Sequence, residues 1–559
     1  MMSYLTRRKA AFSSKLASRT TISGWVLEKQ PTSFAEEGEW TNIDSDVTPE
    51  ERRTWSSLTI AGFWFSDALN AQGWEAPSSI ISAGLTWREA FYLTICGSLV
   101  DTVPLVMNGL MGARLHIPFP VAIRSSFGFY FSRFAIVVRM ATALFWHAIQ
   151  TWTGSTAMFQ MIRAIFPSFL EIPNHLPANA GITTQEMIAH FVFWSVQFPF
   201  MLTPPHKLKY FFYFKAVIVP IICTATVIAM TKKAHGVGEI WRQPYSLPAG
   251  STRSWMILNQ FSSICGGWAT MATNVPDFTR YMKRSRGVWW QALLLPSISL
   301  LIGTFGIIST SCAKVVYGEY IWSPLDLATR WDGPWGRCGA FFVGFCWVVA
   351  QIGTNLSANV ISCSNDMVNL LPKYINIRRG AIITTVTAGW IMVPWKIISS
   401  AQSLLTFMSG LSIFLAPIAA ILAADYWIVK SRKIDVPGLY RRHGRYRYNA
   451  AGMNWRAAVA FFVSLGPNLP GMAKAVNSSI KINAGIEHIW DMNYLWGFCS
   501  AFLLYVGLSM AWPAEETLLE GMIWDDSAHE GIEVGSSGDD REGEATGEEK
   551  SAGDKVKAH

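Results

Sequence analysis

The chain has 559 residues, of which 51% are hydrophobic and 15% are charged, with a mean hydropathy of +0.24 and a net charge of +8. Because soluble proteins usually carry about 25% charged residues, this composition excludes an ordinary soluble enzyme and favours a membrane protein. The basic residues lie in short loops between apolar stretches, so we expect no nucleic-acid partner. The chain has no HExxH or Walker A motif and no GxSxG in a strand–helix context, so we expect neither enzyme activity nor a cofactor.

Twelve apolar stretches follow one another along the chain, each near the roughly 20 residues needed to cross a bilayer. Because helices satisfy the backbone economically in lipid, the pattern predicts an all-α polytopic membrane protein with twelve transmembrane helices. The predicted spans are residues 56–82, 90–112, 127–154, 187–204, 211–231, 255–282, 288–312, 339–362, 378–396, 398–424, 455–476 and 494–513.

Clusters of basic residues mark alternate loops of this arrangement. Arg52 and Arg53 precede the first span, and further clusters follow each even-numbered span from the second to the tenth. Positive residues favour the cytoplasmic side of a membrane. The pattern therefore predicts a multi-pass protein, which we expect in the plasma membrane, with both termini in the cytoplasm.

Two polar tails flank the predicted transporter domain, which covers residues 51–513. Residues 1–50 form a cytoplasmic amino-terminal tail, and the acidic residues 514–559 are typical of a disordered cytoplasmic tail. The second tail offers lysines to a ubiquitin ligase, whereas an inert solubilising tail is the alternative. These lysines are Lys550, Lys555 and Lys557.

Two predicted spans contain residues that interrupt a helix. Span 1 has Gly73 and Pro77 among polar groups near its centre, and span 6 has Gly266, Gly267 and Pro276. If the first ten helices form two repeats of five, spans 1 and 6 occupy equivalent positions. Matched interruptions of this kind indicate the central site of a transporter, whereas kinked but purely structural helices are the alternative.

Spans 3 and 8 carry polar and aromatic residues at helical spacing. Trp146 and Gln150 are four residues apart and share one helix face, where an indole and an amide suit a flat heterocycle. An interfacial Trp and a Gln that bonds another helix are the alternative. Asn355 and Asn359 lie one turn apart in a segment too polar to face lipid, so we expect it to contact a cavity or another helix.

The predicted spans contain ionisable residues that are candidates for function: Asp67 and Glu75 in span 1, and Lys215 in span 5. A charge in hydrocarbon is unfavourable, so each should be paired or hydrated. A carboxylate and an ammonium on facing helices can couple protonation to transport. For Lys215 the alternative is a side chain that extends to the nearby cytoplasmic surface.

Six segments occur in order between residues 40 and 512: Trp40–Asp44, Glu51–Trp55, His116–Val121, Arg124–Gly128, Asn274–Tyr281 and Asn355–Asn359. Together they resemble the nucleobase:cation symporters of the first type, and in particular the fungal uracil, allantoin, uridine and thiamine permeases. The resemblance implies two inverted repeats of five helices, with interrupted helices 1 and 6, and two peripheral helices. It also implies a solute site between spans 1, 3, 6 and 8.

The resemblance implies roles for individual residues in solute binding. Trp146, Gln150 and Asn359 match solute-binding residues of the family. Trp268 occupies the position at which some members stack a span-6 Trp on the solute, and the familiar fungal members carry other residues there. We therefore expect these four residues to bind the solute.

The resemblance also bears on the coupling ion. The sodium site of sodium-driven members uses hydroxyl groups of span 8, and Gly353 at one of these positions supplies none, although Thr354 does. Asp67 and Lys215 match the acidic and basic coupling positions of the proton-coupled fungal branch. We therefore predict that Asp67, Lys215 and Thr354 take part in proton coupling.

These features predict a secondary active transporter in the membrane lipid, which imports a small nucleobase-like heterocycle of the uracil or allantoin type together with protons. Two alternatives remain open from the sequence. One is a thiamine, uridine or nicotinamide-riboside permease, and the other is a nutrient receptor that binds a solute without transporting it.

Overall fold

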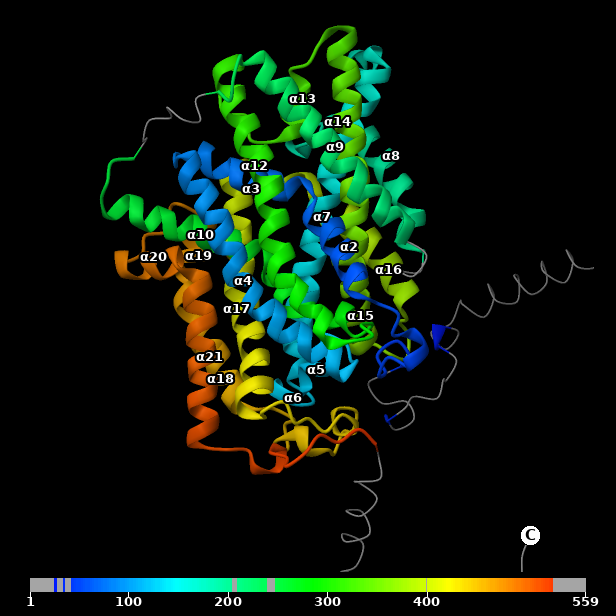
Figure 1. Ribbon diagram of the computed structural model, residues 1–559, viewed down its shortest axis with the longest axis vertical. Helices are drawn as coiled ribbons and strands as arrows, with labels where there is room; N and C mark the ends of the chain where they lie inside the picture. The colour runs from blue at the N-terminus through cyan, green and yellow to red at the C-terminus, as the bar shows by residue number, and fades with distance from the viewer. Residues whose placement is uncertain are drawn as a thin grey trace, which may run out of the picture.

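The computed structural model describes residues 25–27, 34–35, 42–203, 209–238, 247–398 and 400–525. Over these residues the chain is folded almost entirely into helices (Figure 1). Seven of the described helices are long and apolar enough to cross a membrane. Each of the twelve predicted spans coincides with a helical segment, so the all-helical prediction is confirmed.

The segments that coincide with the predicted spans are, in chain order, α2 (Ser57–Ala68) with α3 (Ala71–Ser82), α4 (Trp87–Leu115), α7 (Ser132–Ile165), α8 (Thr184–Met201), α9 (Lys209–Lys233), α10 (Ser251–Asn274) with α11 (Pro276–Thr279), α12 (Gln291–Tyr317), α14 (Gly333–Thr354) with the π-helix η7 (Asn355–Val360) and α15 (Ile361–Leu370), α16 (Ile377–Val386) with η8 (Thr387–Ile391), α17 (Ala401–Ala424) with η10 (Asp425–Val429), α18 (Trp455–Leu465) with α19 (Leu469–Val476), and α21 (Asn493–Ala511). Shorter connecting helices include α5 (Phe119–Ala122), α6 (Arg124–Phe127), α13 (Pro324–Thr329) and α20 (Ala484–Asp491).

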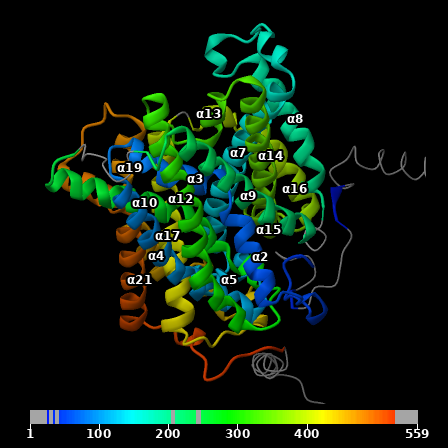
Figure 2. The ribbon, with the colours of Figure 1, turned by 45° about the horizontal axis from the view of Figure 1, so that its top comes forward.

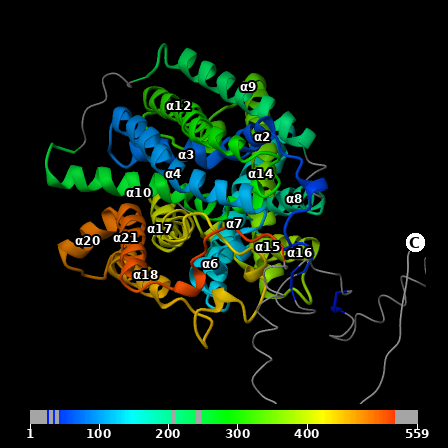
Figure 3. The same ribbon diagram turned by 60° about the horizontal axis from the view of Figure 1, so that its bottom comes forward.

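The helices form one bundle around the interrupted first span. α3 packs against α12, and α4 packs against both α10 and α12. α18 and α21 pack against α17 on one side of the bundle, away from α8 and α16 (Figures 2 and 3). α13 lies at one end of the molecule, and α5 and α6 lie at the other (Figure 1).

Four of the long helices begin at a residue that caps them. The side chains of Ser56, Thr86, Thr183 and Ser400 each accept a hydrogen bond from the backbone N–H three residues further on. In each case the side chain of that third residue bonds back to the capping residue, which completes a capping box. Each cap stabilises its helix by about 1 kcal/mol, and together they fix where α2, α4, α8 and α17 begin.

The first span is interrupted, as predicted, but Gly73 and Pro77, which were expected to interrupt it, lie inside α3. α2 ends at Ala68 and α3 begins at Ala71, because Leu69 and Asn70 adopt non-helical backbone angles. The Asn70 side chain donates to the carbonyl of Asp67 at 2.7 Å and accepts from the N–H of Gly73 at 2.8 Å. This amide therefore bridges the two half-helices and holds the break in one geometry.

The prediction for span 6 was wrong at Gly266 and Gly267, because α10 is continuous from Ser251 to Asn274. Val275 joins it to α11 without a break, since Val275 has helical backbone angles and its N–H donates to the carbonyl of Met271 at 2.9 Å. A Cβ added at Gly266 would lie 2.1 Å from the carbonyl oxygen of Met408 in α17. Gly266 therefore allows α10 and α17 to pack closely. A glycine inside a helix costs only about 1 kcal/mol, which tight packing against α17 offsets.

The end of the predicted amino-terminal tail packs against the helical bundle. Asn42 donates to the carbonyls of Pro372 at 3.2 Å and Ile375 at 3.0 Å. Within residues 42–50, Ser45 is buried. Most of residues 1–41 lie outside the described residues.

The beginning of the predicted carboxy-terminal tail also lies against the body of the protein. The backbone N–H of Val436 donates to the carbonyl of Ile523 at 3.0 Å. Residues 526–559 lie outside the described residues, together with the three lysines proposed for a ubiquitin ligase.

Candidate functional site

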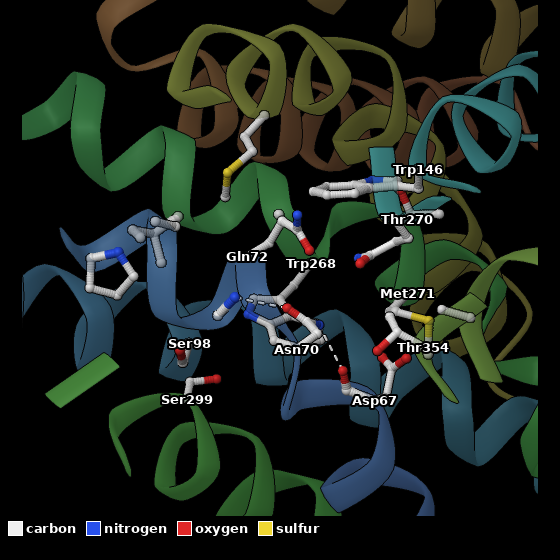
Figure 4. Close-up of a pocket in the computed structure, with 18 of the residues that line it drawn as sticks. Asp67, Asn70, Gln72, Ser98, Trp146, Trp268, Thr270, Met271, Ser299 and Thr354 are labelled. Atoms are coloured by element: carbon white, nitrogen blue, oxygen red, sulfur yellow. Dashed lines mark hydrogen bonds between the residues drawn. The ribbon is translucent and has the colours of Figure 1, made fainter. Parts of the chain in front are cut away.

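A cavity lies at the break of the first span. It is lined by residues of α2, α3, α4, α7, α10, α12, α14, η7 and α17 (Figure 4). The structure places all four predicted solute-binding residues there: Trp146 and Gln150 from α7, Trp268 from α10 and Asn359 from η7. Trp146, Gln150 and Asn359 are exposed by only 7%, 3% and 2%, so this part of the cavity is well screened from solvent.

Aromatic neighbours outside the cavity orient the two indole rings. The ring of Trp146 lies edge-on to Phe407, with centroids 5.5 Å apart. The ring of Trp268 lies edge-on to Trp64, with centroids 5.9 Å apart. Trp64 is held in turn, because its Nε1–H donates to the side chain of Gln291 at 3.0 Å. Both indoles therefore reach the cavity in a supported orientation, ready to stack on a flat ring.

Four polar atoms of the cavity lining lack a hydrogen-bond partner among the described residues, and Gln150 Oε1 and Thr270 Oγ1 are two of them. Leaving a buried polar atom unpaired costs about 1–3 kcal/mol. A solute with N–H groups on its ring relieves this cost, because an amide oxygen accepts hydrogen bonds. Thr270 was not singled out by the sequence analysis, since one threonine in an apolar helix carries no distinctive signal.

A chain of amides orients Asn359 toward the cavity. Asn359 Nδ2 donates to Asn355 Oδ1 at 3.0 Å. Asn355 Nδ2 in turn donates to Thr151 of α7 and to Gln197 of α8, both at 3.2 Å. The two asparagines belong to the π-helix η7, a local distortion that is frequent at functional sites. The second N–H and the carbonyl oxygen of the Asn359 amide are available to a solute.

The predicted coupling residues lie at one border of the same cavity. Lys215 is fully buried, and its ammonium group donates to the carbonyl of Ser66 and to Thr354 Oγ1, the latter at 2.9 Å. The carboxylate of Asp67 accepts a hydrogen bond from Ser357 at 2.9 Å. Because Asp67 and Thr354 line the cavity, this charged group borders the solute site. The alternative that Lys215 extends to the surface is therefore wrong.

Gly353 makes room for the Lys215 side chain. A Cβ added at Gly353 would lie 2.5 Å from Lys215 Cδ and 3.0 Å from Lys215 Nζ. A serine at this position and the buried ammonium would therefore compete for the same space. The side-chain cation contacts a span-1 carbonyl and a span-8 hydroxyl, the groups that would otherwise be available to a free cation.

Glu75, the third ionisable residue noted in the sequence, lies in α3 and is not among the residues that line the cavity. It is buried, with Oε2 3.5 Å from Nε2 of Gln72. Gln72 Nε2 also donates to Thr153 at 3.0 Å. Cavity-lining residues lie on both sides of Glu75 in α3, so Glu75 is outside the lining but is joined to it through Gln72.

A second buried charged cluster was missed by the sequence analysis. Arg139 of α7 pairs with Asp366 of α15, and its Nη1 lies 3.7 Å from Oδ2 of Asp277 in α11. Asp277 Oδ1 also accepts from the backbone N–H of Phe119 at 2.9 Å. The cluster joins three helices about two turns before Trp146 on α7, toward the end of the molecule that carries α5. An arginine inside an apolar span was the signal available for finding it.

Comparison with known proteins connects this geometry to a family. Residues 47–497 match the family described as permeases for cytosine/purines, uracil, thiamine and allantoin. The allantoin permease of Saccharomyces cerevisiae is 33% identical over 85% of this chain and 76% of that protein. The uracil permease of the same yeast is 31% identical over 87% of this chain and 78% of that protein. An uncharacterised permease of Schizosaccharomyces pombe is 38% identical over 86% of each chain.

A solved structure shares the fold. Mhp1, a transporter of the nucleobase-cation-symport-1 family solved in a closed conformation with bromovinylhydantoin bound, superposes with a TM-score of 0.69 at 20% identity. The match covers 86% of this chain and 97% of Mhp1. The architecture is therefore that of Mhp1, an all-helical polytopic membrane fold.

Proposed function

Because the chain belongs to the family of permeases for cytosine/purines, uracil, thiamine and allantoin, we propose that it imports a neutral heterocycle of the uracil or allantoin type together with protons. It is a multi-pass membrane transporter and not an enzyme. The plasma membrane is the proposed location, with both termini in the cytoplasm. The basic clusters in alternate loops and the relation to fungal permeases support this location.

The observation that carries the proposal is the meeting of two indole rings, the unpaired Gln150 Oε1 and the oriented Asn359 amide in one cavity. A flat heterocycle placed between Trp146 and Trp268 gains stacking energy from each indole. Its N–H edge donates to Gln150 and its carbonyl edge accepts from Asn359. Imide and ureide rings carry both edges, which is why the uracil and allantoin types fit this arrangement.

The charges around the cavity favour a neutral solute over a cationic one. Of the described residues that line the cavity, Asp67 alone is ionisable, and the Lys215 ammonium lies next to it at the same border. A permanently cationic solute, such as thiamine or nicotinamide riboside, needs an uncommitted carboxylate when it leaves water. Asp67 is engaged by Ser357 and attracted to Lys215, so it is poorly suited to that task.

Proton coupling is supported by the buried ammonium of Lys215. This ammonium group lies between α2 and α14 and supplies the positive charge that a bound sodium ion would otherwise bring. Asp67 borders both this ammonium and the solute cavity, which makes its carboxylate the proposed proton-binding group. In the proposed cycle a proton and a solute enter from outside, the site closes over them, and both leave on the cytoplasmic side.

Uptake of radiolabelled solutes into cells that lack their own permeases tests the proposed substrate. We expect saturable uptake with uracil or allantoin as the preferred competitor, with uridine weaker and thiamine without effect. Uptake should be faster at acidic external pH. Protein confirmed at the cell surface that takes up none of these solutes would contradict the proposal and favour a nutrient receptor.

A further inference from the structure

The cavity has a second polar end, whose residues have no role in the proposed function. Ser98 of α4 and Ser299 of α12 line the same cavity as Trp146 and are exposed by only 0% and 6%. α4 and α12 pack against each other, so the two serines belong to one wall. Figure 4 shows both side chains on the opposite side of the cavity from Trp146 and Thr270.

The two serine hydroxyls lack a hydrogen bond that several other hydroxyls on α4 and α12 make. Thr94 and Thr102 of α4 and Ser297 of α12 each donate to the backbone carbonyl four residues earlier, at 2.7 Å. Hydroxyl groups inside membrane helices commonly satisfy themselves in this way. Ser98 and Ser299 instead have no hydrogen-bond partner among the described residues, although both hydroxyls are buried. Each retains one donor and two acceptor positions for a ligand.

The surroundings of the two serines are closely packed and mostly apolar. A Cβ added at Gly303 of α12 would lie 3.0 Å from Pro77 Cγ and 3.5 Å from Thr94 Cγ2. α3, α4 and α12 therefore meet with little space between them at this wall. The unpaired hydroxyls face the cavity in a setting where few other polar groups compete for a ligand.

We propose that Ser98 and Ser299 form a second subsite, which binds a neutral polar substituent on the transported ring. A substituent with both donors and acceptors fits this pair, and a ureido group and a sugar hydroxyl group share that chemistry. The proposal rests on the proposed function, because the ring itself must occupy the end of the cavity with Trp146 and Gln150. The subsite then distinguishes substituted rings from the same rings without a substituent.

Two matched pairs of compounds test this subsite. Hydantoin is the ring of allantoin without its ureido group, and uracil is the base of uridine without its sugar. Each compound is measured as an inhibitor of uptake of a labelled transported solute, in wild type and in Ser98→Ala, Ser299→Ala and the double variant. Ser297→Ala, on the same helix but with its hydroxyl bonded to Leu293, is the control.

We expect the serine variants to weaken inhibition by the substituted compound of one pair by about tenfold. Inhibition by the corresponding unsubstituted ring should not change. A loss confined to allantoin identifies a ureido site, and a loss confined to uridine identifies a sugar site. An equal loss of inhibition for the ring and its substituted partner, or no loss for either, would overturn the proposed subsite. A wild-type protein that transports no heterocycle would instead refute the proposed function on which the subsite rests.

Discussion

Replacing Lys215 with methionine is expected to lower the initial rate of solute uptake by roughly a factor of 100. Methionine fills a similar volume but removes the ammonium that contacts the Ser66 carbonyl and Thr354 Oγ1. The nearby carboxylate of Asp67 then lacks its compensating cation. A buried carboxylate without a nearby compensating cation is strongly unfavourable. The residual uptake should also lose its dependence on external pH.

Two further variants separate coupling from a general effect on folding. Gly353→Ala places a Cβ 2.5 Å from Lys215 Cδ, so it should displace the ammonium and reduce uptake in the same direction. Lys232→Met changes an exposed lysine near the end of α9 and should leave uptake unchanged. Surface amounts are measured for each variant. Wild-type rates with unaltered pH dependence in Lys215→Met would exclude the ammonium from coupling.

The Gln150→Ala variant is expected to lose high-affinity uptake while the protein still reaches the cell surface. The buried Oε1 of Gln150 has no partner among the described residues, so the alanine removes the proposed hydrogen-bond acceptor for the solute. Loss of a hydrogen bond in such a site raises KM by roughly 10- to 100-fold. The measurement is the KM of radiolabelled uptake, with the amount of protein at the surface determined in parallel.

Gln160 supplies a matched control on the same helix. Its Oε1 is also buried and without a partner among the described residues, but Gln160 is not among the residues that line the cavity. Gln160→Ala should therefore preserve KM, even if it changes the amount of folded protein. A Gln150→Ala variant with wild-type KM would show that this amide does not contact the solute.

The sequence was most informative where the signal is local. Apolar stretches of spanning length identify helices because the lipid leaves the backbone few alternatives. Trp146 and Gln150 were expected on one face because they lie four residues apart, and the structure places both in the cavity. A break in the first span was also predictable from its polar residues, although it falls at Leu69 and Asn70 and not at Gly73 or Pro77.

Other features depend on contacts between distant segments, and local patterns do not reveal them. Gly266 predicted a break, but the structure uses it for close packing against Met408. The partners of Lys215 come from two other helices, so its burial could not be distinguished from extension to the surface. Ser98 and Ser299 look like ordinary small residues until the packing of α4 and α12 leaves their hydroxyls unpaired.

Accumulation of a solute by the purified protein in proteoliposomes tests the central claim most directly. Labelled uracil and allantoin are supplied with an inward proton gradient, an inward sodium gradient or no gradient. We expect accumulation above the external concentration with the proton gradient, whether or not sodium is present. Accumulation that requires sodium, or none above the external concentration under any gradient, would contradict it.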